Sequence, residues 1–430
     1  MSTTTGPVVI VDPFSSGAQY APALAGYGVP VVAVSSHPRI PTAYAASFDP
    51  SAFTEVITYE GDFDQLVARL GALGPTGVLP GTEVAVELAE RLAARLTPGR
   101  ANLPGLADAR RHKYRMAEAV EAAGVPVIRQ RCTASEAEIA DWLVREGLTG
   151  RDLVVKPPKS GSTDGVTRIP GGVDWQTPFR AQLGQLNQWG IVNDQMLVQE
   201  YAEGVEYVVD TATTAPGRHT VANVCRYSKV ANGSYMAVYE SMDWVAPDAP
   251  EVPALVAYVK EVLDALGFRF GAAHVEVMLT ADGPRLIELN ARPHGGGHPR
   301  FNRAATGDSQ VDRVVRALVG EDGDPAGGDG YELLSPTRVV FLMSTRQGVV
   351  GNTAPLRAVS GLTSHLHSDV LIRDGDRLEV TKDLLATLAM GFVVLSHPDP
   401  AVIERDYREI RRRESALVFD EAAPAAGLPV

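Results

Sequence analysis

The chain has 430 residues, a formal net charge of −13 and 45% hydrophobic residues, enough for about two to four domains with apolar cores. Its acidic balance and scattered arginines argue against nucleic-acid binding, which requires a basic surface to displace counterions. The apolar runs are far shorter than the ~18–20 residues of a membrane span, and the N-terminal segment has neither a basic region nor a cleavage site. We therefore expect a cytoplasmic protein with no nucleic-acid and no membrane partner.

The first hundred residues follow a β-α-β pattern. Apolar runs at 8–11 and 29–34 flank a helical stretch, which predicts a parallel sheet. The nearby sequence SSGAQ lacks GxGxxG, so a dinucleotide fingerprint is not supported, although the layer architecture is similar. A further strand at 77–80 precedes a helix, and Glu83 lies at the N-terminal end of that helix, where parallel α/β sheets bind ligands. The helix dipole alone also favours a carboxylate at this position.

The rest of the chain divides where the pattern of predicted helices, strands and glycine-rich turns changes. A boundary at 102–106 precedes a helix that we expect over 107–123, and strands separated by glycine-rich turns fill 150–300, as in α+β domains. A last unit mixes strands with a helix from Ala401. The expected organisation is an α/β domain over 1–104, a central domain over 105–320 with subdomains at about 117–200 and 201–320, a linker over 321–330, an α+β domain over 331–420 and a tail over 421–430.

A lysine ends the apolar strand at 153–156, and a loop of small residues follows it as far as Gly165. Glycines allow backbone N–H groups to approach a polyphosphate, and Lys156 at the strand end supplies a point charge to it. The loop is not a Walker A motif, because no GKS or GKT opens a helix there. An exposed hairpin turn is the alternative interpretation.

A second polar cluster is expected in the hairpin formed by 274–278 and 285–292. Strand alternation places His274, Glu276 and Met278 on one face, and Glu288, Asn290 and Arg292 on one face of the partner strand. Two carboxylates and an amide oxygen suit Mg²⁺, and an adjacent arginine can stabilise charge on a phosphoryl group. A solvated hairpin face is the alternative.

These features together resemble the ATP-grasp superfamily. A strand lysine precedes a glycine-rich loop, QEYAEGVEY at 199–207 resembles the hinge strand, and a glutamate on one strand is followed by ExNxR on the next. The resemblance covers roughly residues 105–318. It implies an ATP-grasp fold of α/β and α+β type, with an N-terminal Rossmann-like domain and a small C-terminal α+β domain, similar to biotin carboxylase. ATP and two Mg²⁺ ions, replaceable by Mn²⁺, are the implied cofactors.

The resemblance also implies roles for individual residues. Arg292 and Lys156 are the expected catalytic residues, and Glu276, Glu288 and Asn290 match the metal ligands. The expected ATP-binding residues are Lys113, Lys156, Lys159, Ser160, Gly161, Ser162, Thr163, Gln199, Glu200, Tyr201, Ala202 and Glu206. The expected substrate residues are Glu83, Glu240, Asp243, Arg292, His294, Gly295 and Gly296.

Within the superfamily, the chain resembles the L-amino acid ligases that form dipeptides. Acidic groups at Glu83, Glu240 and Asp243 would bind an α-ammonium group, although those ligases carry a histidine where Asp243 stands. The implied reaction phosphorylates one carboxylate and joins the acyl phosphate to a second amino acid. We keep three alternatives: a bicarbonate-using carboxylase, a ligase for a γ-glutamyl or non-proteinogenic amine or peptide substrate, and a non-catalytic nucleotide-binding regulator. A homodimer is a separate expectation.

His294 and His298 have the i, i+4 spacing of a zinc pair on a helix. The three glycines between them argue against a helix, so we expect a loop whose histidines line the substrate cleft or its rim.

Overall fold

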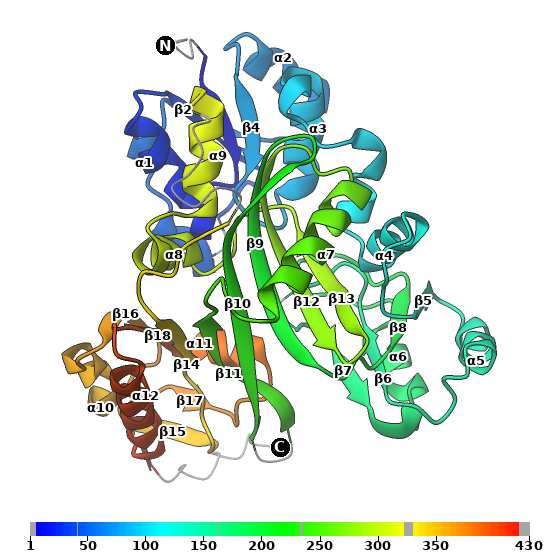
Figure 1. Cartoon of the computed structure of the whole chain (residues 1–430), viewed down its shortest axis with the longest axis vertical. Helices are drawn as coiled ribbons and strands as arrows, with labels where there is room; N and C mark the ends of the chain where they lie inside the picture. Colours follow the sequence, from blue (N-terminus) through cyan, green and yellow to red (C-terminus); the bar gives the residue numbers. More distant parts are fainter. Residues whose placement is uncertain (1–5, 41, 162, 233–234, 322–329, 421–430) are drawn as a thin grey trace, which may run out of the picture. The chain divides into compact units, whose positions relative to one another are not determined.

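The computed structural model describes residues 6–40, 42–161, 163–232, 235–321 and 330–420. The chain divides into two compact units (Figure 1). The first comprises Met1–Ser160, Asp164–Val224 and Ala246–Glu332, and the second comprises Gly161–Thr163, Cys225–Val245 and Leu333–Val430. The expected linker over 321–330, apart from its two end residues, and the expected tail over 421–430 lie outside the described residues.

The first unit begins with a parallel sheet of order β3-β2-β1-β4, as the β-α-β pattern predicts. Apolar β-branched residues fill both faces, and the four residues of the first strand are fully buried, as is typical of a parallel sheet covered by helices. The elements are β1 (Val8–Val11), β2 (Val31–Ser35), β3 (Glu55–Thr58), β4 (Gly77–Pro80), α1 (Tyr20–Ala25), α2 (Phe63–Gly71) and α3 (Val86–Leu96).

A small antiparallel sheet of order β5-β8-β6-β7 follows. Its apolar face packs against α5 and α6 through Ile139, Val155 and Phe179, which are completely buried. The elements are α4 (Lys113–Ala122), β5 (Gln130–Thr133), α5 (Glu136–Arg145), β6 (Leu153–Lys156), β7 (Thr167–Ile169), α6 (Gln176–Gln182) and β8 (Met196–Glu200).

The helix expected over 107–123 is shorter than predicted, because α4 begins only at Lys113. Residues 104–110 form two 3-10 turns instead, and Arg110 is completely buried in an ion pair with Glu90, with 2.6 Å between Nε and Oε1. His112 then caps the helix by accepting a hydrogen bond from the amide of Arg115. The burial of a charged side chain by tertiary contacts therefore sets the start of this helix.

A larger antiparallel sheet completes the first unit with the strand order β13-β12-β9-β10 (Figure 1). Val311, Val314 and Leu318 of α9 pack with Val8 and Ile10 of β1 in one apolar core. The elements are β9 (Val205–Ala215), β10 (Arg218–Asn232), which continues into the second unit, α7 (Val252–Ala265), β12 (Gly271–Thr280), β13 (Gly283–Asn290), α8 (His298–Thr306) and α9 (Gln310–Val319).

The second unit contains two antiparallel sheets, of orders β10-β11-β14-β18-β16 and β17-β15-β19, as the α+β prediction for the C-terminal region requires. Its core gathers Val340, Val350, Leu356, Val393 and Ile410. The elements are β11 (Tyr235–Trp244), β14 (Thr337–Phe341), β15 (Gly348–Asn352), α10 (Ala354–Arg357), β16 (His365–Val370), β17 (Arg377–Leu378), α11 (Leu384–Met390), β18 (Gly391–Ser396), α12 (Pro400–Ser415) and β19 (Val418–Asp420).

Short 3-10 helices connect these elements. They are η1 (Ser15–Gln19), η2 (Thr42–Ser47), η3 (Pro50–Ala52), η4 (Pro98–Arg100), η5 (Pro104–Leu106), η6 (Asp108–Arg110), η7 (Pro170–Gly172) and η8 (Ala358–Gly361). Among the described residues, no helix combines the length and the apolar character that crossing a bilayer requires.

Candidate active site

The hairpin of β12 and β13 brings together polar side chains from the faces that alternation predicts. Glu276 stands opposite Glu288, and His274 stands opposite Asn290. On the other side of β12, His274 stands opposite Asp210 of β9. Because alternate residues of a strand share a face, these five polar side chains lie on one face of the sheet. Directly after Glu276 the register shifts by one residue, and regular pairing then continues as far as Thr280 and Gly283.

The pKa values of the two glutamates are shifted in opposite directions. Burial raises the pKa of Glu276, but a hydrogen bond from His274 and nearby cations outweigh this and lower it to about 2. Burial raises the pKa of Glu288, and the neighbouring Glu276 carboxylate contributes, although Lys113 acts in the opposite direction. Two partly buried carboxylates that repel each other, with an amide oxygen one row away, form a donor set that a divalent cation would stabilise. The set therefore fits Mg²⁺ or Mn²⁺.

Two lysines border these carboxylates. The ammonium group of Lys113 donates to Glu288 Oε1 at 2.9 Å and to the carbonyl oxygen of Ser160, so it joins α4, β13 and the loop after β6. Lys156 is buried at the end of β6. Burial lowers the pKa of Lys156 to about 8, and the charge of Lys113 contributes, while three glutamates oppose the shift: Glu288, Glu276 and Glu206.

The loop after Lys156 contains the expected phosphate-binding residues. Lys159 pairs with Asp108 at 3.1 Å, and Ser160 donates to the Asp164 carboxylate at 2.8 Å. Gly161 and Thr163 belong to the second unit, in which the amide of Leu384 donates to Thr163 Oγ1. Ser162 lies outside the described residues.

Gly165, which ends this loop, is a position where only glycine fits. It has a φ of +69°, and a Cβ atom there would lie 2.1 Å from Oε1 of Gln182.

The expected adenine-binding residues lie at the end of β8. Gln199 is buried, whereas the Glu200 carboxylate forms an ion pair with Arg129 at 2.5 Å. The amide of Glu200 donates to the Arg129 carbonyl, and the amide of Tyr201 donates to the Asp152 carbonyl. An adenine edge would therefore bind to other backbone groups of this segment, such as those of Ala202. Glu206, also buried, stands on β9 opposite Met278.

Arg292 lies two residues beyond the end of β13, with a largely buried side chain that is 17% exposed. Its Nε atom lies 3.1 Å from Glu83 Oε2, and Glu83 Oε1 accepts a hydrogen bond from Arg111 at 2.5 Å. Glu83 therefore lies between two guanidinium groups that balance its charge. A direct role of Glu83 with a substrate ammonium group remains a prediction, because its carboxylate already holds Arg292.

The glycine-rich segment after Arg292 is held by η1 of the N-terminal sheet region. Ser16 donates to the carbonyl oxygen of His294 and accepts from the amide of Gly297 at 3.0 Å. Gln19 donates to the Gly297 carbonyl at 3.1 Å. Gly296 and Gly297 have φ values of +64° and +73°, in the left-handed region that favours glycine. The segment is thus a fixed turn that ends at the start of α8.

The two histidines of this segment, His294 and His298, are buried. Residues 294–297 form the expected loop, and α8 starts at His298. The His294 and His298 rings stack with centroids 3.8 Å apart. Burial lowers the pKa of His294 to about 4, with a further contribution from His274, so His294 is neutral at physiological pH. Contacts with Asp210 of β9 and Ser16 of η1 hold His294 in place, and its assignment to the substrate stays a prediction.

Sequence reasoning missed Asp210, Ser16, Gln19 and Arg111. Asp210 shares a face of β9 with Glu206, and this alternation was visible in EYVVDTAT, but its partners depend on pairing with a strand 64 residues away. Ser16 and Gln19 belong to the SSGAQ segment, where the absence of a dinucleotide motif gave no reason to assign a role.

Glu240 and Asp243 lie on β11 in the second unit. Asp243 stands opposite Arg338 of β14 and accepts from its Nε at 2.6 Å. Glu240 lies at a register shift of β11 and accepts a hydrogen bond from the hydroxyl of Tyr407. Both carboxylates therefore have cationic or hydroxyl partners within the second unit, and their assignment to substrate remains a prediction.

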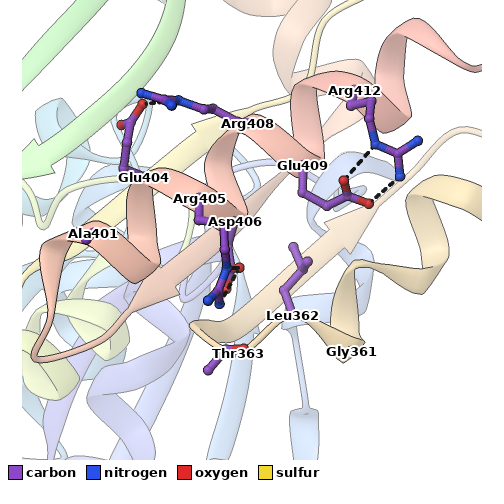
Figure 2. A pocket seen from close by; sticks show the side chains of 10 residues that line it. All are labelled: Gly361, Leu362, Thr363, Ala401, Glu404, Arg405, Asp406, Arg408, Glu409 and Arg412. Carbon is purple, nitrogen blue, oxygen red and sulfur yellow. Dashed lines mark hydrogen bonds and ion pairs between the residues drawn. The ribbon is translucent and has the colours of Figure 1, made fainter.

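A hollow of about 780 Å³ beside α12 is a separate feature of the second unit (Figure 2). Its three lining arginines form ion pairs along the same helix: Arg405 with Asp406, Arg408 with Glu404 and Arg412 with Glu409. Because neighbouring carboxylates balance these cations, the hollow does not concentrate positive charge. We assign no nucleotide site to it.

Comparisons with known proteins match the same region. The model of the ATP-grasp domain matches residues 149–298, which include Lys156 and the polar hairpin. Dapdiamide A synthase from Enterobacter agglomerans is 28% identical over 417 residues, covering 95% of this chain and 96% of that protein. A D-alanine–D-alanine ligase from Cupriavidus metallidurans is 28% identical over 180 residues, covering 39% of this chain and 52% of that enzyme.

Solved structures share the fold over nearly the whole chain. The L-amino acid ligase from Bacillus licheniformis superposes with a TM-score of 0.73 at 16% identity, covering 96% of this chain and 98% of that one. An N5-carboxyaminoimidazole ribonucleotide synthetase in its ADP complex superposes with a TM-score of 0.66 at 18% identity, covering 95% and 98%.

Proposed function

We propose that this chain, which is an ATP-grasp ligase of the L-amino acid ligase type, uses ATP to join two amino acids through an amide bond. The matches to known proteins confirm the predicted fold and the predicted class of C–N bond-forming ligase. The substrates, the acyl phosphate, the metal ions and the roles of single residues stay proposals. The cytoplasmic location and the homodimer also stay predictions.

The proposed reaction has two steps. A carboxylate oxygen of the first amino acid attacks the γ-phosphorus of ATP, the bond from phosphorus to the β,γ-bridging oxygen breaks, and ADP leaves with that oxygen. The amine of the second amino acid then attacks the acyl carbon, the carbon–oxygen bond to phosphate breaks, and the amine loses a proton. Such transfers need positioning and charge stabilisation more than covalent help from the protein.

The side chains of the first unit fit these steps. Lys156 and Lys113 supply positive charge beside the phosphates, and Arg292 stabilises the charge that develops at the transferring phosphoryl group. Glu276, Glu288 and Asn290 would hold Mg²⁺, which neutralises phosphate charge when bound. The turn over Gly295–Gly297 would bring the backbone N–H groups of Gly295 and Gly296 near the reacting carboxylate, while the Gly297 N–H donates to Ser16.

One observation carries the proposal: two partly buried glutamates face each other, a lysine joins one of them to the loop after β6, and an arginine follows the same strand, all in one unit. A protein that only bound nucleotide would not need Arg292 at this position. The relative named for synthesis of dapdiamide A covers almost the full chain, and this supports an amide-forming ligase of amino-acid-like substrates.

A screen of amino-acid pairs tests this function. We expect ADP release from ATP and Mg²⁺ only when a matched pair of amino acids is present, with a condensed product of the corresponding mass. Hydrolysis of ATP that depends on bicarbonate but on no amine would instead indicate a carboxylase. Nucleotide binding without turnover for any pair, including γ-glutamyl and non-proteinogenic candidates, would contradict the ligase proposal.

Replacement of Lys156 by methionine is expected to weaken ATP binding on the order of tenfold, because a buried positive charge next to the phosphates is lost. Since its pKa is about 8, the ammonium charge is present below that pH and lost above it. ATP affinity of the unaltered protein should therefore fall as pH rises through about 8. Calorimetric titration with ATP from pH 7 to 9.5 measures both effects.

Lys260→Met on α7 is the matched control, and it should bind ATP like the unaltered protein. The pH dependence near 8 should persist in Lys260→Met and disappear in Lys156→Met. Equal nucleotide affinities of all three proteins would count against the assignment of Lys156.

A further inference from the structure

Asp210, on β9, is a completely buried carboxylate with hydrogen-bond partners on other segments of the first unit. Its Oδ1 atom lies 2.9 Å from Nδ1 of His274, and its Oδ2 atom lies 2.9 Å from Nδ1 of His294. Asn223 also donates to Oδ2 at 2.9 Å. Each carboxylate oxygen therefore has a hydrogen bond with a different histidine. These bonds compensate the buried negative charge, which would otherwise be costly to remove from water.

The two histidines lead from Asp210 to different parts of the candidate site. Nε2 of His274 lies 3.3 Å from Oε1 of Glu276, one of the proposed metal ligands. His294 belongs to the turn that follows Arg292, and its backbone is held by Ser16 and by Gln310. The rings of His274 and His294 pack with centroids 4.0 Å apart. Asp210 thus connects, through the two histidines, the proposed metal ligand and the turn that follows Arg292.

We propose that Asp210 is a positioning residue that fixes Glu276 through His274 and fixes the turn after Arg292 through His294. This inference rests on the proposed function. A histidine that joins a carboxylate to a metal ligand restricts the ligand's orientation, and loss of such an outer partner typically costs 10–100-fold in metal affinity or activity. The hydrogen bonds of Asp210 therefore restrict both Glu276 and the turn after Arg292, which would act on the same phosphoryl group.

A metal centre is the competing interpretation of these side chains. Asp210, His274 and His294 each offer one ligand atom, and these atoms lie within 4.8 Å of one another. The hydrogen bonds account for the arrangement, because each histidine is directed at its own carboxylate oxygen. We therefore favour positioning, and we make a zinc centre one of the outcomes of the test.

The test measures Mn²⁺ binding in the presence of ADP by electron paramagnetic resonance. Asp210→Asn keeps the shape but cannot accept from both histidines with the same oxygens, and His274→Gln removes the link to Glu276. Each variant should raise the Mn²⁺ dissociation constant at least about tenfold, while metal-free ADP affinity changes less than about twofold. The double variant should bind Mn²⁺ within about twofold of the weaker single variant, because both changes break one connection.

Asp264→Asn is the matched control. Asp264 accepts from Nε2 of His219 at 3.1 Å, a second carboxylate–histidine pair in the same unit, and its loss should leave Mn²⁺ binding unchanged. Unchanged Mn²⁺ affinity in His274→Gln, or single effects that multiply in the double variant, would overturn the proposal. One zinc per chain in the purified protein, lost in Asp210→Asn, would overturn it in favour of a metal centre.

The test also separates this inference from the function. If Asp210→Asn does not fold, as judged by circular dichroism, the result for His274→Gln still decides the outcome. Mn²⁺·ADP binding that depends on Asp210 in a protein without ligase activity would support the positioning role and contradict the proposed reaction. An active ligase whose Mn²⁺ affinity changes in neither variant would support the proposed reaction and contradict the positioning role of Asp210.

Discussion

Arg292→Ala is expected to lower kcat by on the order of a hundredfold or more. The largely buried guanidinium group is held by Glu83, and its charge helps to lower the pKa of Glu276. A preorganised cation is worth most where negative charge spreads over a transferring phosphoryl group and little water is present. Steady-state ADP release with the substrate pair found by the screen measures the effect.

Arg285→Ala is the matched control for Arg292→Ala. Arg285 stands near the other end of the same strand. Its guanidinium group donates hydrogen bonds to the carbonyl oxygens of Asp282 and Pro284 in the hairpin turn. We expect turnover within about twofold of the unaltered enzyme. Near-normal ADP release by Arg292→Ala would remove this residue from the proposed mechanism.

Glu288→Gln is expected to reduce turnover on the order of a hundredfold or more and to raise the concentration of Mg²⁺ needed for half-maximal activity. The substitution keeps the size of the side chain and its contact with Lys113, but it removes one of two charges in the proposed metal site. It also leaves Lys113 and Lys156 with one fewer carboxylate to balance them. A titration of kcat against free Mg²⁺ measures both changes.

Glu121→Gln tests whether loss of any nearby glutamate has the same effect. Glu121 is exposed on α4, the helix that also bears Lys113, and its neutralisation should change neither kcat nor the Mg²⁺ requirement. A Glu288→Gln enzyme with the Mg²⁺ requirement of Glu121→Gln would show that the proposed ligand set is wrong.

Local patterns were sufficient to predict the strands and the hairpin. The turn at Asp282–Gly283 and the alternation of side chains predict a hairpin with polar groups on one face. The register that starts at this turn would place Glu276 opposite Ile287, and the register shift after Glu276 places it opposite Glu288 instead. The parallel β-α-β start and the loop after Lys156 follow equally from local periodicity and from small residues. The candidate site could be predicted as far as it depends on neighbours in sequence.

Contacts between distant segments could not be predicted in this way. Asp210 meets His274 only because β9 pairs with β12, and Glu83 meets Arg292 across 209 positions of the sequence. Burial of His294 depends on Ser16, which comes from the opposite end of the unit. Each of these contacts requires tertiary packing, which neither alternation nor motif spacing encodes.

The transfer of a labelled oxygen tests the proposed reaction most directly. The first amino acid of the active pair is labelled with ¹⁸O in its carboxyl group, and the released phosphate is examined by mass spectrometry after single turnover. We predict one ¹⁸O atom in the phosphate, because the carboxylate oxygen that attacks ATP stays with phosphorus when the amine displaces it. Amide formation with unlabelled phosphate, or with the label in AMP, would contradict an acyl-phosphate ligase.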